Sequence, residues 1–261
     1  YRKMKLKNIL IIFLIFIFVY KVPKVYSLDS RQELFEEALL QSSNGDFILA
    51  LEKWNKYLEI FPEDAAALSN RGNIKLVNGD PKGSIQDQDN AIHLDPNELD
   101  PYINRGIAEE ALGLWDEAKG DYLYVLSKDE KNFSALYNLA NVEGSLANWK
   151  NARDLFSKAS LYNPGSVMAR SSMALADYEL DNYEQSEKEL RKLIRKYPTF
   201  ADARAALTAL EWSKGNYGEA ESNWIAAVEL DPRYSQEDWL LEVRRWPNKP
   251  TKDLMKFISI K

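Results

Sequence analysis

Residues 201–232 read ADARAALTALEWSKGNYGEAESNWIAAVELDP, and much of the chain repeats the pattern of this stretch. Apolar and small side chains recur at helical spacing on both sides of Lys214-Gly215-Asn216, which indicates two amphipathic helices joined by a tight turn. The stretch ends at Pro232, and stepping back in strides of 34 residues reaches a proline at 198, 164, 96 and 62, with Glu130 at the remaining position. A fixed period of this length indicates a repeat protein.

Other positions obey the same period in six units, which cover 31–64, 65–98, 99–132, 133–166, 167–200 and 201–234. Two positions in each unit hold only small side chains, which lets paired helices approach closely where they cross. These are Ala38, Gly72, Gly106, Ala140, Ala174 and Thr208 at position 8, and Ala50, Ser84, Ala118, Ala152, Ser186 and Ala220 at position 20. Position 24 is bulky and apolar except at Gln88. Each unit is therefore predicted to form one helix pair.

The predicted turns inside the units carry residues that suit helix ends. Glycine is expected to end the first helix because it adopts a left-handed backbone without strain. It stands there at Gly45, Gly79, Gly113 and Gly215. Aspartate or asparagine follows as the expected N-cap of the second helix. These residues are Asp46, Asp80, Asn148, Asn182 and Asn216.

The pattern resembles the tetratricopeptide repeat (TPR) family over residues 31–234. The resemblance implies an all-α, right-handed superhelical solenoid of six helix-turn-helix repeats within 28–234, followed by a C-terminal capping helix and tail at 235–261. In the tail we expect a helix over 236–245, a break at Trp246-Pro247 and a short helix over 251–260. Capping of the last repeat is the favoured role of the tail. A docking motif at Arg244-Arg245-Trp246-Pro247 is the alternative.

Residues 1–27 differ in character from the rest of the chain. They hold six basic side chains and no acid, with an apolar run at 9–20 that is short for a membrane span. This pattern is typical of a signal peptide cleaved after Ser27, and an uncleaved N-terminal membrane anchor or a misread start are the alternatives. A signal or an anchor exports the repeats. The expected location is the periplasm or thylakoid lumen, or a membrane-anchored form with the repeats on the non-cytoplasmic side.

Composition and motifs argue against several classes of function. The net charge of −6 becomes −12 once the six basic residues of 1–27 are set aside, so a nucleic acid is not an expected partner. Cysteine is absent, and His93 is the single histidine, so neither a metal site nor a nucleophilic site is expected. No phosphate-binding or nucleophile motif is present. We therefore expect no catalytic residue, no metal and no cofactor, and the protein is not expected to be an enzyme.

The resemblance places binding on the concave face, which the first helices line. Asn70, Asn104 and Asn138 recur at position 6 and are expected to stack as a ladder of amides. They could hold the backbone of a protein segment or extended peptide, or they could satisfy local backbone groups instead. Asn73, Tyr137, Asn141 and Trp212 are further candidates on this face. The basic residues of the family's chaperone-tail clamp are missing from these positions, which disfavours that role.

The favoured function is a non-enzymatic, exported scaffold for protein–protein interaction. Residues 237–247, EDWLLEVRRWP, resemble the tails of exported TPR proteins of cyanobacteria and chloroplasts. That resemblance implies an assembly or stability factor for a membrane or photosynthetic complex, and a periplasmic envelope-complex subunit fits a non-photosynthetic source. Membrane association through residues 9–20 is expected if they are not cleaved. The alternative is a receptor that holds a small ligand or peptide in the concave groove.

Overall fold

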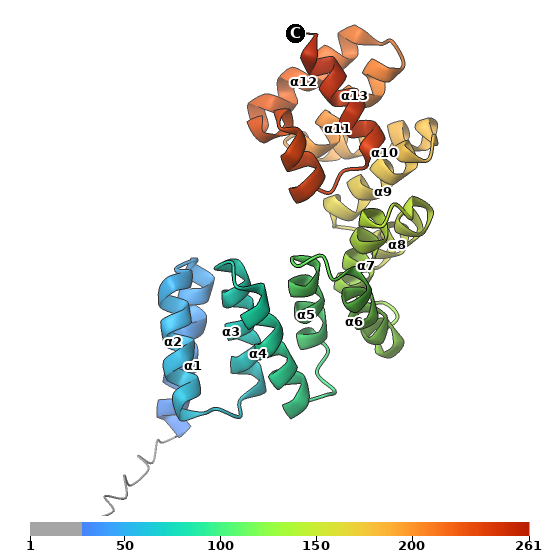
Figure 1. The fold of residues 1–261 in the computed structure, drawn as a ribbon. Helices are drawn as coiled ribbons and strands as arrows, with labels where there is room; N and C mark the ends of the chain where they lie inside the picture. Colours follow the sequence, from blue (N-terminus) through green and yellow to red (C-terminus); the bar gives the residue numbers. More distant parts are fainter. Residues whose placement is uncertain (1–27, 261) are drawn as a thin grey trace, which may run out of the picture.

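A computed structural model describes residues 28–260, and all the secondary structure within them is helical (Figure 1). Twelve of the α-helices form six consecutive pairs. The first helices of the pairs are α1 (Leu28–Asn44), α3 (Ala65–Val77), α5 (Asp100–Glu110), α7 (Phe133–Ser145), α9 (Val167–Glu179) and α11 (Ala201–Ser213). The second helices are α2 (Phe47–Ile60), α4 (Pro81–Leu94), α6 (Trp115–Lys128), α8 (Trp149–Tyr162), α10 (Tyr183–Lys196) and α12 (Tyr217–Leu230). This arrangement confirms the predicted all-α solenoid.

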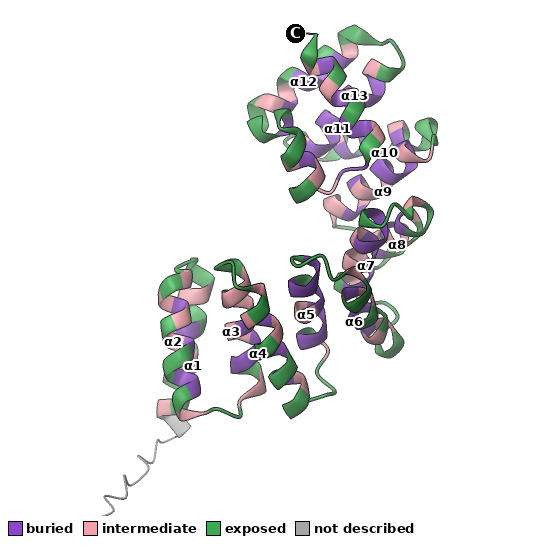
Figure 2. Cartoon of the chain, viewed as in Figure 1, coloured by how far each residue is buried: buried purple, intermediate pink, exposed green. Residues whose placement is uncertain are grey.

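The core repeats from unit to unit as the small positions predict. Every position 8 and position 20 residue is buried, and the buried faces of successive pairs follow one another along the solenoid (Figure 2). The bulky position 24 side chain fills the space that position 8 leaves. A Cβ atom added at Gly106 would lie 2.7 Å from the ring of Tyr122. Close contact between the two helices therefore requires a small side chain at position 8.

Unit 2 replaces the apolar position 24 side chain with a hydrogen-bonded one. Gln88 is completely buried, and its Nε2 donates to the backbone oxygen of Ser69 at 3.0 Å and to Asn73 Oδ1 at 3.1 Å. A Cβ atom on Gly72 would lie 2.6 Å from the same nitrogen. The amide thus fills the site of an aromatic ring and ties the core of unit 2 to the exposed side of α3.

The turn inside each unit uses a left-handed residue at position 15. The four predicted glycines have φ between 72° and 82°, and two residues with side chains, Ala147 and Asp181, take the same conformation with φ of 60° and 65°. This backbone conformation returns the chain into the second helix. The turn geometry is therefore common to all six described units, although only four of them contain glycine.

The expected N-caps divide into two groups. Asp46 and Asp80 cap their helices, because each accepts a hydrogen bond from the backbone N–H three residues later. Asn148, Asn182 and Asn216 also occupy the predicted N-cap positions, but their side chains make no capping bond. Their side-chain amides donate instead to a mostly buried carboxylate five residues earlier, on Glu143, Asp177 and Glu211 respectively. The charged acceptor fixes the orientation of each amide through its Nδ2 group, and the amide oxygen makes no capping bond.

The tail contains the expected helix over 236–245 only at 237–243, mostly as a π-helical turn, whereas the break at Trp246-Pro247 and the helix after it are confirmed. It forms a 3₁₀ turn, η1 (Pro232–Ser235), then a π-helical turn, η2 (Trp239–Val243), and then helix α13 (Asn248–Ser259). Helix α13 packs against α11 and α9, so it covers the last repeats from the side of the first helices (Figure 1). Leu254 and Phe257 of α13 are buried in the same core cluster as Leu207 and Leu210 of α11. The capping helix exists, and it lies along the inner side of the solenoid.

The predicted signal or anchor at 1–27 lies outside the described residues. Between residues 28 and 260, none of the helices combines the length and the apolar character that crossing a membrane requires.

Candidate functional site

First helices of neighbouring units lie against one another, α3 against α5 and α5 against α7, and form a continuous inner surface. Two hollows lie on this surface, one of about 370 Å³ across α3 and α5 and one of about 380 Å³ across α5 and α7. They share Asn73, Asp100 and Asn104, so we treat them as one feature and call it the open groove. It spans units 2 to 4 and is open to solvent.

The predicted asparagine ladder lies along the open groove, but its members have different partners. Asn70 donates to the backbone oxygen of Ala66 at 2.9 Å, which is the local bond that the alternative interpretation foresees. Asn104 Nδ2 reaches across to unit 2 and donates to Ser69 Oγ at 3.1 Å. Within the described residues, the side chain of Asn138 makes no hydrogen bond. Part of the amide hydrogen-bonding capacity therefore remains available to a ligand.

Two of the other candidates lie in the open groove as well. Asn73 lies between the two hollows and accepts the hydrogen bond from Gln88, which fixes its orientation. Tyr137 stacks on Phe133 with ring centroids 5.9 Å apart and contacts Phe156 at 5.5 Å. Asn141 is half-buried one helical turn further along α7. Unit 4 therefore contributes an aromatic wall, and unit 2 a polar one.

Trp212 lies away from this groove. Its ring contacts Tyr217 at 4.7 Å and Phe257 of α13 at 5.7 Å, so the capping helix packs on it. The indole is half-buried in this position. The structure therefore places Trp212 in the contact between α11 and α13 and not beside the other six candidates.

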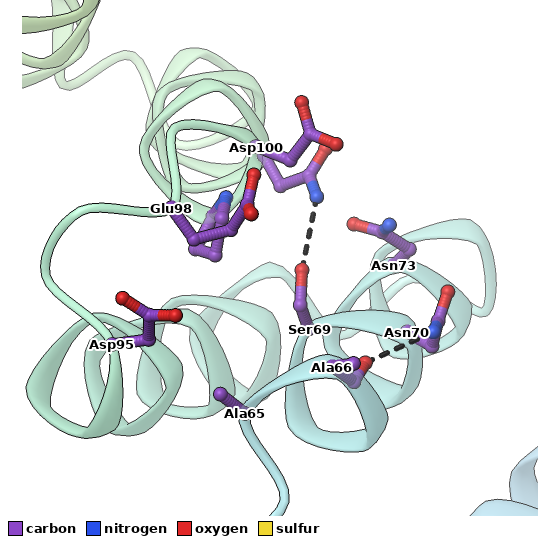
Figure 3. A pocket seen from close by; sticks show the side chains of 10 residues that line it. Ala65, Ala66, Ser69, Asn70, Asn73, Asp95, Glu98 and Asp100 are labelled. Carbon is purple, nitrogen blue, oxygen red and sulfur yellow. Dashed lines mark hydrogen bonds between the residues drawn. The ribbon is translucent and has the colours of Figure 1, made fainter.

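Three carboxylates, two on the loop between α4 and α5 and one at the start of α5, complete the open groove and were missed in the sequence. Asp95, Glu98 and Asp100 line the hollow across α3 and α5 (Figure 3). Asp95 and Glu98 accept backbone hydrogen bonds from Asn97 and Leu99, whereas Asp100 has no hydrogen-bond partner among the described residues. The run DPNELD at 95–100 carried this signal, but it resembled an ordinary solvated turn. The groove thus combines carboxylates with amides, which suits positively charged and N–H-bearing groups.

The corresponding surface of units 5 and 6 is already occupied by the tail of the same chain. Asp202, at the start of α11, is completely buried and accepts hydrogen bonds from four different side chains. The donors are Ser171 Oγ at 2.5 Å, the Tyr234 hydroxyl at 2.9 Å, Arg244 Nη2 at 2.7 Å and Trp246 Nε1 at 3.0 Å. Burial opposes the charged form of Arg244, yet the charge of Asp202 outweighs it and raises the pKa of the guanidinium. One carboxylate therefore anchors most of the tail segment.

Residues further along the tail make polar contacts with other first helices. The guanidinium of Arg245 forms an ion pair with Glu110 of α5 and lies 5.8 Å from the ring of Trp115. Lys249 Nζ donates to the backbone oxygen of Glu179 at 2.7 Å. Asp253 accepts from the Tyr178 hydroxyl at 3.0 Å. The tail thus fills the inner surface from α11 to α9 and reaches α5.

Comparison with known proteins gives matches to tetratricopeptide repeat proteins. Residues 172–235 match the family model described as tetratricopeptide repeat. Tetratricopeptide repeat protein 36 of Bos taurus is 26% identical over 99 residues, which are 36% of this chain and 53% of that protein. The chain spans about half the length, or less, of the first curated relatives that it matches.

Solved structures share the same fold over more of the chain. A tetratricopeptide repeat protein from Parabacteroides merdae superposes with a TM-score of 0.63 at 21% identity, covering 88% of this chain and 99% of that one. YrrB, a TPR protein with an unusual peptide-binding site, superposes with a TM-score of 0.55 at 21% identity, covering 69% of this chain and 92% of its own. The 34-residue register and the six helix pairs extend along the chain the tetratricopeptide repeat pattern that the family model matches over residues 172–235.

Proposed function

We propose that the protein is a non-enzymatic scaffold that binds an extended segment of another polypeptide in the open groove. One observation carries the proposal: the inner surface is filled by polypeptide over units 5 and 6 and uncovered over units 2 to 4. The filled part holds Arg244-Arg245-Trp246-Pro247 of the same chain by side-chain hydrogen bonds and ion pairs. The uncovered part offers the amides of Asn73, Asn104 and Asn138.

The chemistry of the open groove suits a peptide backbone. Each asparagine amide has donors and an acceptor that can pair with backbone C=O and N–H groups. A single such bond contributes only about 0.5–1.5 kcal/mol, so useful affinity requires several bonds along the groove together with apolar contact on Tyr137 and Phe133. YrrB, which has the same fold, is in keeping with peptide binding by this architecture.

We propose further that the protein is exported and acts as an assembly or stability factor for a membrane or photosynthetic complex. The basic and apolar pattern of residues 1–27 supports export to the periplasm or thylakoid lumen, by a cleaved signal or a retained anchor. The sequence EDWLLEVRRWP supports the link to photosynthetic membranes. Intact mass of the protein from its native cells tests cleavage, because cleavage after Ser27 removes residues 1–27. Recovery of the protein from the cytoplasm alone, with these residues retained, contradicts export.

A small-ligand receptor is the second candidate function. The hollow across α3 and α5, of about 370 Å³, falls within the range of ordinary small-molecule sites, roughly 300–1,000 Å³. A receptor of this kind gains thermal stability when its ligand is added. Screening the purified protein with small metabolites tests this candidate, and a flat melting temperature throughout the screen argues against it.

A crosslinking experiment tests the proposed scaffold function. A photo-crosslinking residue replaces Asn138 in the open groove, and the matched control carries the same residue at Ile48, which is 82% exposed on α2. In native cells we expect a discrete polypeptide adduct from position 138 and none from position 48.

The variant Asn70→Ala, Asn104→Ala, Asn138→Ala is expected to recover less of the same partner. Equal recovery by a folded triple variant, or the absence of an adduct specific to position 138, contradicts the proposal.

A further inference from the structure

The occupied surface around Asp202 has an equivalent in the open groove. Asp202 is at position 2 of unit 6, and its hydrogen-bond donor Ser171 is at position 5 of unit 5. The same two positions in units 3 and 2 hold Asp100 and Ser69, each 102 residues earlier, which is three repeat lengths. Ser69 and Asp100 line one hollow, so both aspartate–serine pairs lie on the inner surface at equivalent positions of the repeat.

The occupied pair shows what such a site binds. Arg244 donates to Asp202 Oδ1 from both Nε, at 3.1 Å, and Nη2, at 2.7 Å. The indole of Trp246 donates to the same oxygen, while Ser171 donates to the other one. The ligand of this carboxylate is therefore an arginine followed two residues later by an aromatic residue, in a non-helical segment between η2 and α13.

The open pair has the same groups, and their hydrogen-bonding capacity is not used. Asp100 accepts no hydrogen bond from any described residue and lines the same hollow as Ser69 (Figure 3). Ser69 is only 8% exposed, and its Oγ accepts from Asn104, but within the described part of the chain its hydroxyl hydrogen has no acceptor. Ser69 is therefore a buried donor facing the groove, in the place where Ser171 bonds to Asp202.

The surroundings of Asp100 also favour a positive charge. Asp95 and Glu98 line the same hollow, and no basic side chain lines it. A guanidinium placed there gains attraction from three carboxylates, and planar arginine pairs with carboxylate better than lysine does. Asn132 replaces Tyr234 at position 34, so this site lacks the hydroxyl that covers Asp202. It is consequently more open to solvent than the occupied site.

We propose that Asp100 and Ser69 form an arginine subsite of the open groove, which holds an arginine in an extended segment of a partner protein. This inference rests on the proposed scaffold function and names the chemistry of the partner. The segment resembles the chain's own Arg244–Pro247 in having an arginine close to an aromatic residue. The tail keeps its place on units 5 and 6, and the partner occupies units 2 to 4.

A peptide with the sequence of residues 236–250, QEDWLLEVRRWPNKP, is a suitable probe when added to the full-length protein. Binding of the fluorescently labelled peptide is measured by anisotropy at low salt. We expect Asp100→Asn to weaken binding at least tenfold, and replacement of both peptide arginines by glutamine to weaken it similarly. Asp116→Asn is the matched control, since it removes the same charge from an exposed aspartate that makes no side-chain contact within the described residues. This control is expected to bind like the unchanged protein.

The other outcomes overturn the inference in distinguishable ways. If Asp202→Asn weakens binding and Asp100→Asn does not, the peptide merely replaces the resident tail. If glutamine replaces the peptide arginines without effect, or if the peptide does not bind at millimolar concentration, arginine is not the recognised group. If light scattering shows a dimer that Asp100→Asn abolishes, the occupant is a second copy of this chain. The adduct from position 138 does not depend on arginine, so the scaffold function can survive failure of this subsite.

Discussion

Asp202 shows how one buried charge can hold a segment that is distant in sequence. Its carboxylate receives donors from α9, η1 and the residues on both sides of Arg245. A buried carboxylate without such partners would be strongly unfavourable, so the contacts are mutually dependent. At this site, a change in one residue is expected to affect the docking of the whole tail.

The variant Asp202→Asn tests this dependence. It leaves the guanidinium of Arg244 buried without a counter-charge, and we expect a loss of about 3 kcal/mol in the free energy of unfolding. Urea denaturation measures the loss. Trypsin should also cleave faster after Arg244 and Arg245 under native conditions, because the freed tail becomes accessible. A variant whose tail is as resistant to trypsin as that of the unchanged protein contradicts the anchoring role of Asp202.

Glu109 provides a pH-dependent prediction. Burial, reinforced by the nearby charge of Asp121, raises the pKa of Glu109 to about 7 from an ordinary value near 4.5. The raised pKa means that Glu109 adds most to the free energy of unfolding below pH 4.5. This contribution is lost as the pH rises through about 7, because the carboxyl of Glu109 ionises at a lower pH in the unfolded chain than in the folded one. Glu109→Gln should leave stability unchanged at pH 4 and increase it by roughly 1–3 kcal/mol at pH 8. Thermal unfolding from pH 4 to pH 8 measures the effect, and Glu117→Gln is the control. If the difference in stability between Glu109→Gln and the unchanged protein is the same at every pH, the prediction is wrong.

Ala147 and Asp181 give a matched test of the left-handed turn. Both adopt positive φ in positions where four other units have glycine. Ala147 is exposed, so Ala147→Gly relieves strain without loss of contact and should stabilise the fold by about 0.5–1 kcal/mol after the entropy of glycine is counted. Asp181 accepts hydrogen bonds from Tyr183 and Lys249, so Asp181→Gly should gain nothing. Equal effects of the two substitutions, measured by chemical denaturation, contradict this account.

At the scale of elements, the sequence predicted the helix pairs and the order of the tail, but not the short π-helical form of its first helix. The pairs follow from local periodicity and small-residue positions, which the chain displays six times. The tail departs from the expected helix because its ends are tethered elsewhere. The backbone N–H of Arg244 bonds to Trp239 and that of Trp246 to Leu240, which widens the turn while Arg244 and Trp246 reach Asp202. Such distant contacts leave no periodic signal in residues 236–245.

Helix α13 should contribute more to stability than a loosely attached tail. Leu254 is completely buried against the last repeats, and Phe257 is nearly so. We expect Leu254→Ala to cost about 2–5 kcal/mol in the free energy of unfolding, because it leaves a cavity between α13 and α11. Ile260→Ala, at a residue that is 69% exposed, is the control and should cost little. If both variants unfold at the same urea concentration as the unchanged protein, α13 does not belong to the cooperative core.

At the scale of the whole molecule, the register of the repeats predicted the inner surface but not its division into two parts. Six of the seven candidate residues lie on α3, α5 and α7, whereas Trp212 is covered by α13. Which part of the surface is covered depends on how far the tail extends and on which acidic residues it meets. Glu110 and Asp202 become a pair of anchors only when the solenoid curves, and the sequence alone does not specify that curvature.

The ion pair between Arg245 and Glu110 should limit the curvature of the solenoid. Repeat proteins are held together mainly by contacts between neighbouring units, whereas this pair joins residues 135 positions apart. Arg245→Ala removes the link and should broaden the distribution of distances between unit 1 and unit 6. Spin labels on Ile48→Cys and Ile225→Cys, both exposed, can measure this distance distribution by pulsed electron resonance, since the chain has no cysteine of its own.

Arg245 has φ of 53°, so Arg245→Gly serves as the comparison: it relieves the backbone strain but also lacks the guanidinium. Equal broadening in both variants assigns the effect to the ion pair, and an unchanged distribution in Arg245→Ala means that the pair does not limit the curvature.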